Sequence, residues 1–224
     1  MCTVSAVRFG DGVRLVCNRD ELRARPAARP PGQSTVAAGA IAFPIDPLSG
    51  GTWAGARGGA FAAALLNRSI GGAAAVRRAV SRGMIVPALL SCASFDLALD
   101  AARSLDPSAF APFTLLIVDG KHAAVVSTRD IRSPRLREVV APLMLTSSSL
   151  GDAFVDAPRR ALFDVLVRRV VDPLRGQHVF HRHRWPNRRD ISVVVARADA
   201  QTVSRTTIDV TPSGATITYE DSPC

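Results

Sequence analysis

MCTVSAVRFGDGVRLVCNRDE, residues 1–21, is the stretch of sequence that decides the fold. Two β-like runs, residues 3–9 and 13–18, flank Asp11-Gly12, a dipeptide strongly favoured in tight turns, so the pattern predicts an N-terminal hairpin. With Asp11 and Gly12 as the loop, Cys2 lies opposite Glu21 and diagonal to Arg19. A three-residue loop or a bulge would instead place Asp20 opposite Cys2. Either register brings Asn18-Arg19-Asp20-Glu21 beside the N-terminus.

Beyond the hairpin, the sequence predicts a proline-rich loop, short strands, a helical middle layer and closing strands. The loop, ARPAARPPG at residues 24–32, lacks backbone donors at its prolines. Residues 139–145 are a further apolar run. Strands are expected at 36–43, 52–56, 60–66, 113–118, 123–127, 191–196, 203–208 and 215–219. Helices are expected at 73–81, 84–91, 95–105, with Ser94 as N-cap, and from Asp156 onward.

The last of these helices has Pro158 in its first turn and an apolar stripe of Leu162, Val165, Leu166 and Val170. Strands, helices, strands, helix and strands in this order predict an α+β fold with sheets between helices. At 224 residues the chain is long enough for a sizeable core and is expected to form a single domain, residues 1–224.

The charge pattern argues against a nucleic-acid or membrane protein. There are 28 basic and 19 acidic residues, a net charge of +9, and only Lys121 is a lysine. Scattered arginine with abundant alanine is typical of a GC-rich bacterial genome. The densest runs, residues 129–137 and 182–189, contain one aromatic residue, Trp185, and no nucleic-acid motif, which favours a solvated face. Neither a membrane span nor a secretory signal is recognisable, so we expect a cytoplasmic protein.

The other cysteines and the histidines suggest no disulfide, metal or cofactor. Cys17 and Cys92 fit buried small hydrophobic positions, and Cys224 has no companion residues. His178, His181 and His183 lie among arginines, where histidines are usually at the surface, and no fourth ligand at zinc spacing follows.

Cys2 is the candidate for chemistry. If Met1 is excised, Cys2 carries both a thiol and a free α-amine, so one residue supplies a nucleophile and a base. The carboxylates of the run at residues 18–21 could orient this amine, and Arg19 could lower the pKa of the thiol. The residues alone leave two plainer interpretations open: Cys2 as a buried strand residue, and residues 18–21 as a solvated polar turn.

The motifs resemble those of the NRDE family, also called the transport and Golgi organisation family. The resemblance runs almost end to end and implies an αββα sandwich similar to N-terminal nucleophile hydrolases. It points to the cysteine branch that includes penicillin V acylase and bile salt hydrolase, which cleave non-peptide C–N amide bonds. It rests on Met1-Cys2, NRDE at 18–21, Arg25-Pro26, GGTWAG at 50–55, ALLN at 64–67 and SRG at 81–83.

The resemblance also implies roles for individual residues. Cys2 would be the nucleophile and Asp20 the carboxylate that holds its amine, while Arg19 matches the hydrolases at a slightly different spacing. Asn67 is placed for an oxyanion or substrate-amide contact. Arg188 resembles a late arginine that approaches the nucleophile; without the resemblance it reads as a surface arginine.

Further residues are expected to contact the substrate. Trp53 is predicted to line the pocket or to pack in the core, and the turn before it presents Thr52. Asn18 and Glu21 are expected at the same end as Cys2.

The sequence departs from the hydrolases at Ser148, where an asparagine is expected; serine lacks the second donor of an amide. This departure weakens the catalytic interpretation. The combination of Cys2 with the NRDE run still predicts an amidohydrolase acting on a small amide, acyl or lipid-like compound. Its alternative is a non-catalytic binding protein for acyl-CoA, lipid or haem, because eukaryotic relatives are linked to such ligands.

Overall fold

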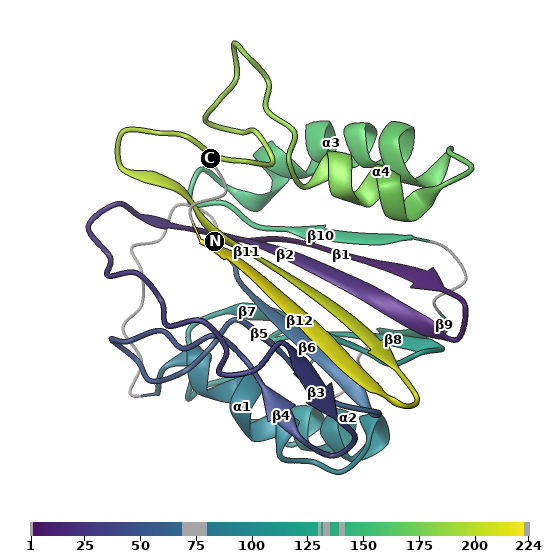
Figure 1. The fold of residues 1–224 in the computed structure, drawn as a ribbon. Helices are drawn as coiled ribbons and strands as arrows, with labels where there is room; N and C mark the ends of the chain where they lie inside the picture. Colours follow the sequence, from purple (N-terminus) through teal and green to yellow (C-terminus); the bar gives the residue numbers. More distant parts are fainter. Residues whose placement is uncertain (1, 69–79, 130, 132–134, 139–141, 222–224) are drawn as a thin grey trace.

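Two antiparallel six-stranded sheets face each other, and helices cover the outer face of each (Figure 1). The computed structural model describes residues 2–68, 80–129, 131, 135–138 and 142–221. The strand order of the first sheet is β10-β1-β2-β11-β12-β3, and that of the second is β4-β5-β6-β7-β8-β9. This arrangement is the αββα sandwich that the sequence predicts.

The strands of the first sheet are β1 (Cys2–Phe9), β2 (Gly12–Leu22), β3 (Thr35–Ala37), β10 (Leu143–Thr146), β11 (Ala200–Thr211) and β12 (Gly214–Asp221). The second sheet contains β4 (Ile41–Ala42), β5 (Ala54–Arg57), β6 (Phe61–Asn67), β7 (Phe113–Val118), β8 (His122–Ser127) and β9 (Arg135–Glu138). Helices α1 (Ile85–Leu90) and α2 (Phe95–Arg103) pack on the second sheet, and α3 (Asp152–Phe163) and α4 (Pro173–Phe180) pack on the first. A 3-10 turn covers Arg82–Met84, and a π-helical turn, Asp164–Arg168, extends α3. None of these helices is long and apolar enough to cross a bilayer.

The core between the sheets is formed by the alternating inward residues of the strands. Val4, Leu15 and Cys17 of the hairpin pack there against Ala64 and Leu116 of the second sheet. A separate apolar core lies between the second sheet and helices α1 and α2. Both cores follow from the period of two along each strand, which sends successive side chains to opposite faces.

The register of the first hairpin differs from both predicted registers. The loop residues are Gly10 and Asp11, Phe9 pairs with Gly12, and Cys2 therefore pairs with Arg19. Gly10 has a φ of +48°, which suits glycine in this turn. Gly12 belongs to the strand instead, because a Cβ atom there would lie 2.5 Å from the carbonyl oxygen of Val210.

The predicted strand at 191–196 is wrong, as is the predicted start of the last long helix. Residues 191–196 form only an isolated bridge, between Ala196 and Gln201. Their backbone N–H groups donate to carbonyl oxygens of loops, as that of Val194 does to His183. Helix α3 begins at Asp152, four residues before Asp156. The predicted strand at 36–43 is divided into β3 and β4, because Gly39, with a φ of +78°, turns the chain between them. The predicted helix at 73–81 lies largely outside the described residues.

The apolar stripe predicted for this helix is only half right, because Leu162 and Leu166 pack against the core whereas Val165 and Val170 are exposed. Its buried residues are Val155, Arg159, Phe163 and Val167, spaced four apart, whereas Val165 is exposed. The sequence pattern missed this face because a buried arginine interrupts it.

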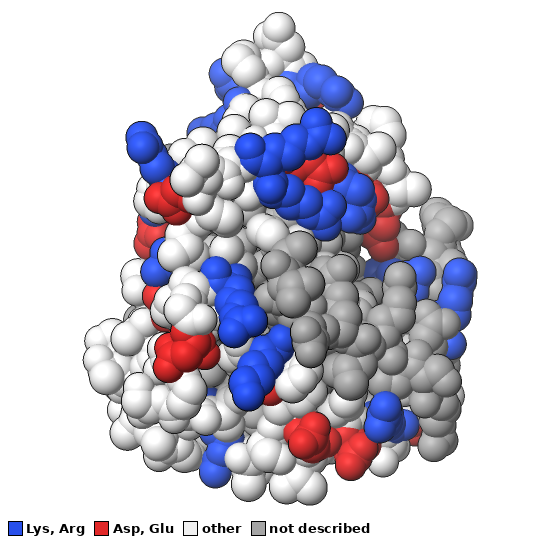
Figure 2. Space-filling model, turned by 90° about the vertical axis from the view of Figure 1, so that its right-hand side faces the viewer, with Lys and Arg blue, Asp and Glu red and all other residues white. Residues whose placement is uncertain are grey.

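Basic side chains lie in small groups with acidic ones among them on the face that Figure 2 shows. Ion pairs account for several of the arginines; Arg14 is paired with Asp209, and Arg182 with Glu220. Such exposed pairs contribute little to stability, but they interrupt the basic surface.

Candidate active site

A polar cavity of about 220 Å³ opens where β2 ends near the loop at residues 46–53 and the turn at 81–83. Cys2 of β1, Arg19 and Glu21 of β2, and Leu65 and Asn67 of β6 line it. The alternation along β2 explains this set, because residues 17, 19 and 21 share the face of Cys2 toward the other sheet. The cavity therefore brings the first residue of β1 together with half of the NRDE run.

The backbone of Cys2 is held by Ser147, directly after β10. The Ser147 N–H donates to the Cys2 carbonyl oxygen at 2.9 Å. The Cys2 N–H donates to Ser147 Oγ at 3.2 Å. The side chain is 4% exposed and borders the cavity. These hydrogen bonds hold the backbone of Cys2 in place beside the cavity.

A second thiol changes the acidity of Cys2. Cys17 lies diagonally across the hairpin on the same face, and the two side chains are hydrogen-bonded. This hydrogen bond lowers the pKa of Cys2 below its ordinary value; burial opposes the change, and the charge of Arg19 adds to it. The same bond raises the pKa of Cys17 well above normal. Cys2 is thus the member of the pair that ionises.

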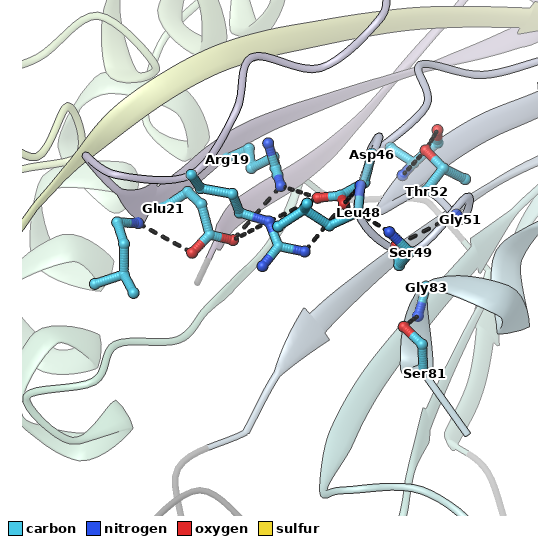
Figure 3. Close-up of polar contacts among 12 residues, drawn as sticks. Arg19, Glu21, Asp46, Leu48, Ser49, Gly51, Thr52, Ser81 and Gly83 are labelled. Carbon is cyan, nitrogen blue, oxygen red and sulfur yellow. Dashed lines mark hydrogen bonds and ion pairs between the residues drawn. The ribbon is translucent and has the colours of Figure 1, made fainter. Parts of the chain in front are cut away.

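Four charged side chains form one wall of the cavity (Figure 3). Asp46 accepts hydrogen bonds from Arg19 at 2.5 Å and from Arg25 at 2.8 and 3.0 Å. Glu21 lies 3.5 Å from Arg19 and 3.6 Å from Arg25. Burial raises the pKa of Asp46, but the hydrogen bonds and charges of Arg25 and Arg19 outweigh it and hold that pKa below its usual range. These ion pairs fix both guanidinium groups in place.

Trp53 and Thr52 belong to the same wall. The guanidinium carbon of Arg19 lies 4.2 Å from the centre of the Trp53 ring, a cation–π contact. Trp53 also packs in the core between the sheets, so the same side chain lines the cavity and fills part of the core. Thr52 lines the cavity, and its hydroxyl donates to the carbonyl oxygen of Ala54 at 3.0 Å.

Asp20 faces the other side of the sheet, toward α3. Its carboxylate accepts a hydrogen bond from the Thr202 hydroxyl at 2.6 Å. Burial raises the pKa of Asp20, and the charge of Arg159 opposes the rise. Arg159 is itself completely buried and donates to Thr3 Oγ1 at 2.9 Å and Thr146 Oγ1 at 2.6 Å. This arginine anchors the residues next to Cys2 and Ser147. Its position four residues from Val155 and Phe163 is the only signal in the sequence that could have revealed it.

Asn18, like Asp20, points away from the cavity. Its side-chain amide donates to the carbonyl oxygens of His181 and Val193 at 2.9 and 3.2 Å. His181, expected at the surface, is completely buried directly after α4, with Nε2 2.7 Å from Ser5 Oγ. Within the described residues, no three His, Cys, Asp or Glu side chains are grouped to hold a metal ion.

Besides Asn18 and Asp20, two further predicted site residues, Ser148 and Arg188, are not among those that line the cavity. The Ser148 N–H donates to Asp152 and its hydroxyl accepts from Leu150, so it shapes the start of α3. Arg188 is exposed on the loop after α4, its guanidinium carbon 5.9 Å from the centre of the Trp185 ring. The cavity instead contains Arg25 and Arg82, which the sequence showed only as parts of motifs.

Solved structures with a similar fold come from amide-hydrolysing enzymes. The N-acylethanolamine-hydrolyzing acid amidase ortholog of Caenorhabditis elegans is 16% identical, with a TM-score of 0.60 over 92% of each chain. Penicillin V acylase from Agrobacterium tumefaciens is 10% identical, with a TM-score of 0.54 over 99% of this chain and 86% of that one. A variant of conjugated bile acid hydrolase from Clostridium perfringens is 12% identical, with a TM-score of 0.53 over 98% and 92%.

The fold is therefore that of the N-terminal nucleophile hydrolases. No curated protein matches the sequence. The family described as Transport and Golgi organisation 2 matches residues 10–168, which is more than half of the chain and includes the whole second sheet and strands β2, β3 and β10 of the first. The chain belongs to the Transport and Golgi organisation 2 family.

Proposed function

We propose that the protein is an amidohydrolase in which Cys2, freed of Met1, is the nucleophile. The observation that carries the proposal is the position of Cys2, which lines a polar cavity while its backbone nitrogen donates a hydrogen bond to Ser147. A thiol with a lowered pKa at the wall of a small cavity supports nucleophilic attack on a bound carbonyl.

The reaction begins when the α-amine of Cys2 accepts the thiol proton. The thiolate attacks the amide carbonyl carbon, and Asn67 donates to the developing oxyanion from the end of β6. The C–N bond breaks as the ammonium returns the proton to the leaving amine. Water then cleaves the thioester, releasing the acid and restoring the thiol.

Ser147 and Asp20 position the amine in this proposal. Ser147 Oγ already accepts a hydrogen bond from the Cys2 nitrogen, and the negative charge of Asp20 would favour the protonated amine. Arg19 contributes a positive charge to the thiolate from the cavity side. We assign no role in this mechanism to Ser148 or Arg188.

Non-catalytic binding of acyl-CoA, lipid or haem is the alternative, and the dimensions of the cavity favour hydrolysis. Ligand pockets for drug-sized molecules are typically about 300–1,000 Å³. The cavity bounded by the described residues is about 220 Å³ and its walls are largely charged or polar. A small amide fits this space better than an extended apolar chain or a macrocycle.

The test begins with the intact mass, which shows whether Met1 has been removed. The processed protein is then incubated with N-acyl amides, including an N-acylethanolamine and penicillin V, which the structural neighbours suggest, and amine release is measured. We expect Cys2→Ser to abolish turnover, whereas Cys92→Ser, which changes a thiol packed near α1 and α2, leaves it unchanged. Retained Met1, or full turnover by Cys2→Ser, would exclude the proposal. Native mass spectrometry showing copurified lipid, acyl-CoA or haem would support the alternative.

A further inference from the structure

We propose that Arg82, Ser49 and Ser81 form an anion-binding subsite in the cavity and that the substrate is a small amide carrying a carboxylate. Only the statement that the bound ligand is a substrate rests on the proposed function. The subsite itself rests on the charge balance of the cavity wall and on the hydrogen-bonding state of these three side chains.

Arg82 is the cation of the cavity that lacks a carboxylate. Arg19 and Arg25 are both paired with Asp46 and Glu21, whereas Arg82 has no ion pair among the described residues. One of its N–H groups donates to the carbonyl oxygen of Pro112 at 2.8 Å, which orients the guanidinium without neutralising it. Three arginines and two carboxylates give the wall a net charge of +1, which suits a monoanion.

The chain holds Arg82 rigidly at the wall. The Thr52 N–H donates to the Gly83 carbonyl oxygen at 2.9 Å, which joins the turn at 81–83 to the loop at 46–53. A Cβ atom at Gly51 would lie 2.3 Å from the Gly83 carbonyl, so the two segments can pack this closely only because residue 51 is glycine. The charge of Arg82 also interacts with Cys2, which places the subsite within electrostatic reach of the sulfur.

Two serine side chains, Ser49 and Ser81, line the same cavity as Arg82. Ser81 Oγ accepts a hydrogen bond from the Gly83 N–H, and Ser49 Oγ accepts one from the Gly51 N–H, both at 3.3 Å (Figure 3). With an acceptor lone pair of each oxygen engaged, each hydroxyl proton remains to be donated. Among the described residues neither proton has an acceptor. A carboxylate between them and Arg82 would receive charge-assisted hydrogen bonds from all three.

The subsite is tested by two alkylating reagents that differ in charge. Iodoacetate is an anion and iodoacetamide is neutral, and both react with the same thiolate, so a change in the pKa of Cys2 cancels in the ratio of their rates. Trypsin cleaves after Arg8 and Arg14, which separates Cys2 from Cys17 for quantification by mass spectrometry. We expect Arg82→Gln to lower the iodoacetate-to-iodoacetamide ratio at Cys2 by about tenfold and Arg82→Lys to retain most of it.

Arg57 provides the matched control. It is also half-buried, also donates to a backbone carbonyl, that of Leu90, and does not line the cavity. Arg57→Gln should leave the ratio unchanged. An unchanged ratio in Arg82→Gln, or an equal fall in Arg57→Gln, would overturn the subsite.

A second measurement uses the unaltered protein, in case Arg82→Gln does not fold. N-acetylglycine and N-acetylglycinamide, which differ only in the carboxylate, are compared as protectants of Cys2 against iodoacetamide. Protection by the acid alone supports the subsite, and equal protection or none overturns it. Because alkylation requires no turnover, a subsite without hydrolysis refutes only the proposed function. Cys2-dependent hydrolysis of neutral amides with an unchanged ratio refutes only the subsite.

Discussion

The two helix-to-sheet contacts of the sandwich differ in chemistry. Between the second sheet and helices α1 and α2 the contact is apolar, with side chains such as Phe61, Leu99 and Leu115. Between the first sheet and helices α3 and α4 buried polar side chains predominate, among them Arg159 and His181, beside a small apolar cluster. An apolar contact is non-directional, whereas a hydrogen-bonded one fixes which atoms meet.

The difference shows which layer positions the candidate site. Arg159 bonds to Thr3 and Thr146, which are the neighbours of Cys2 and Ser147. Its other N–H groups donate to the carbonyl oxygens of Ile191 and Ser192 at 3.0 and 2.7 Å. The polar layer therefore ties α3 to the two chain segments that hold Cys2 and Ser147, whereas the apolar layer packs against the sheet that contributes Leu65 and Asn67 to the cavity.

Replacement of Arg159 should have the largest effect on the stability of the polar layer. Arg159→Met removes four hydrogen bonds to oxygen atoms and the positive charge that opposes the effect of burial on Asp20, and we expect a loss of about 3–5 kcal/mol of unfolding free energy. The measurement is urea unfolding. Arg160→Met is the control, because Arg160 forms an exposed pair with Asp156 and should cost less than about 0.5 kcal/mol. Equal losses in the two variants would show that the buried arginine of the polar layer stabilises the fold no more than an exposed one does.

The apolar layer should respond to loss of volume. Leu99→Ala in α2 removes a buried side chain and is expected to cost about 2–5 kcal/mol while leaving the alkylation rate of Cys2 unchanged. Leu97→Ala, in the same helix but 54% exposed, should cost less than about 0.5 kcal/mol. A change in Cys2 reactivity in the folded Leu99 variant would contradict the assignment of site positioning to the polar layer.

Acid should weaken the polar layer through His181. Burial lowers the pKa of His181 well below normal, and the charges of Arg205 and Arg182 lower it further. The unfolded pKa is about 6.5, so unfolding takes up a proton below this pH, and stability falls by up to about 1.4 kcal/mol per pH unit. His181→Gln should flatten this dependence between about pH 6.5 and 5. His122→Gln, on the second sheet, is the control; the same slope in His181→Gln and in the original protein would disprove the assignment.

The smallest effect is expected from Cys17. Cys17→Ala removes the hydrogen bond that lowers the pKa of Cys2, so the alkylation profile of Cys2 should move to higher pH. At pH 7 the rate should fall roughly threefold to tenfold, as expected for loss of one hydrogen bond. Iodoacetamide labelling against pH measures this, with Cys92→Ala as the control. A shift of the profile to lower pH would contradict the role of the thiol pair.

The sequence predicted the layers well because periodicity and turn residues carry that information locally. Phe113–Val118, apolar on both faces, is a strand covered on both sides, and Ser94 caps α2 as expected, accepting from the Leu97 N–H. The hairpin register was missed because Gly10 and Gly12 both suit a turn. Contact with Val210, almost two hundred residues later, decides between them.

The candidate site was predictable only where it is local. Cys2, Arg19, Glu21, Thr52 and Trp53 come from motifs and meet at the cavity. Arg159 was missed because a buried arginine depends on carbonyl groups of a distant loop, which periodicity does not reveal.

Adjacent residues of the tetrapeptide at 18–21 have separate functions, since Arg19 and Glu21 face the cavity while Asn18 and Asp20 form hydrogen bonds in the polar layer on the other side of the sheet. Evolution can therefore alter one pair without disturbing the other. A descendant that gave up chemistry at the sulfur would still need the asparagine and the aspartate to fold. A search for family members with the proposed activity should therefore give more weight to Arg19, Glu21 and Arg82, which face the cavity, than to the tetrapeptide as a whole.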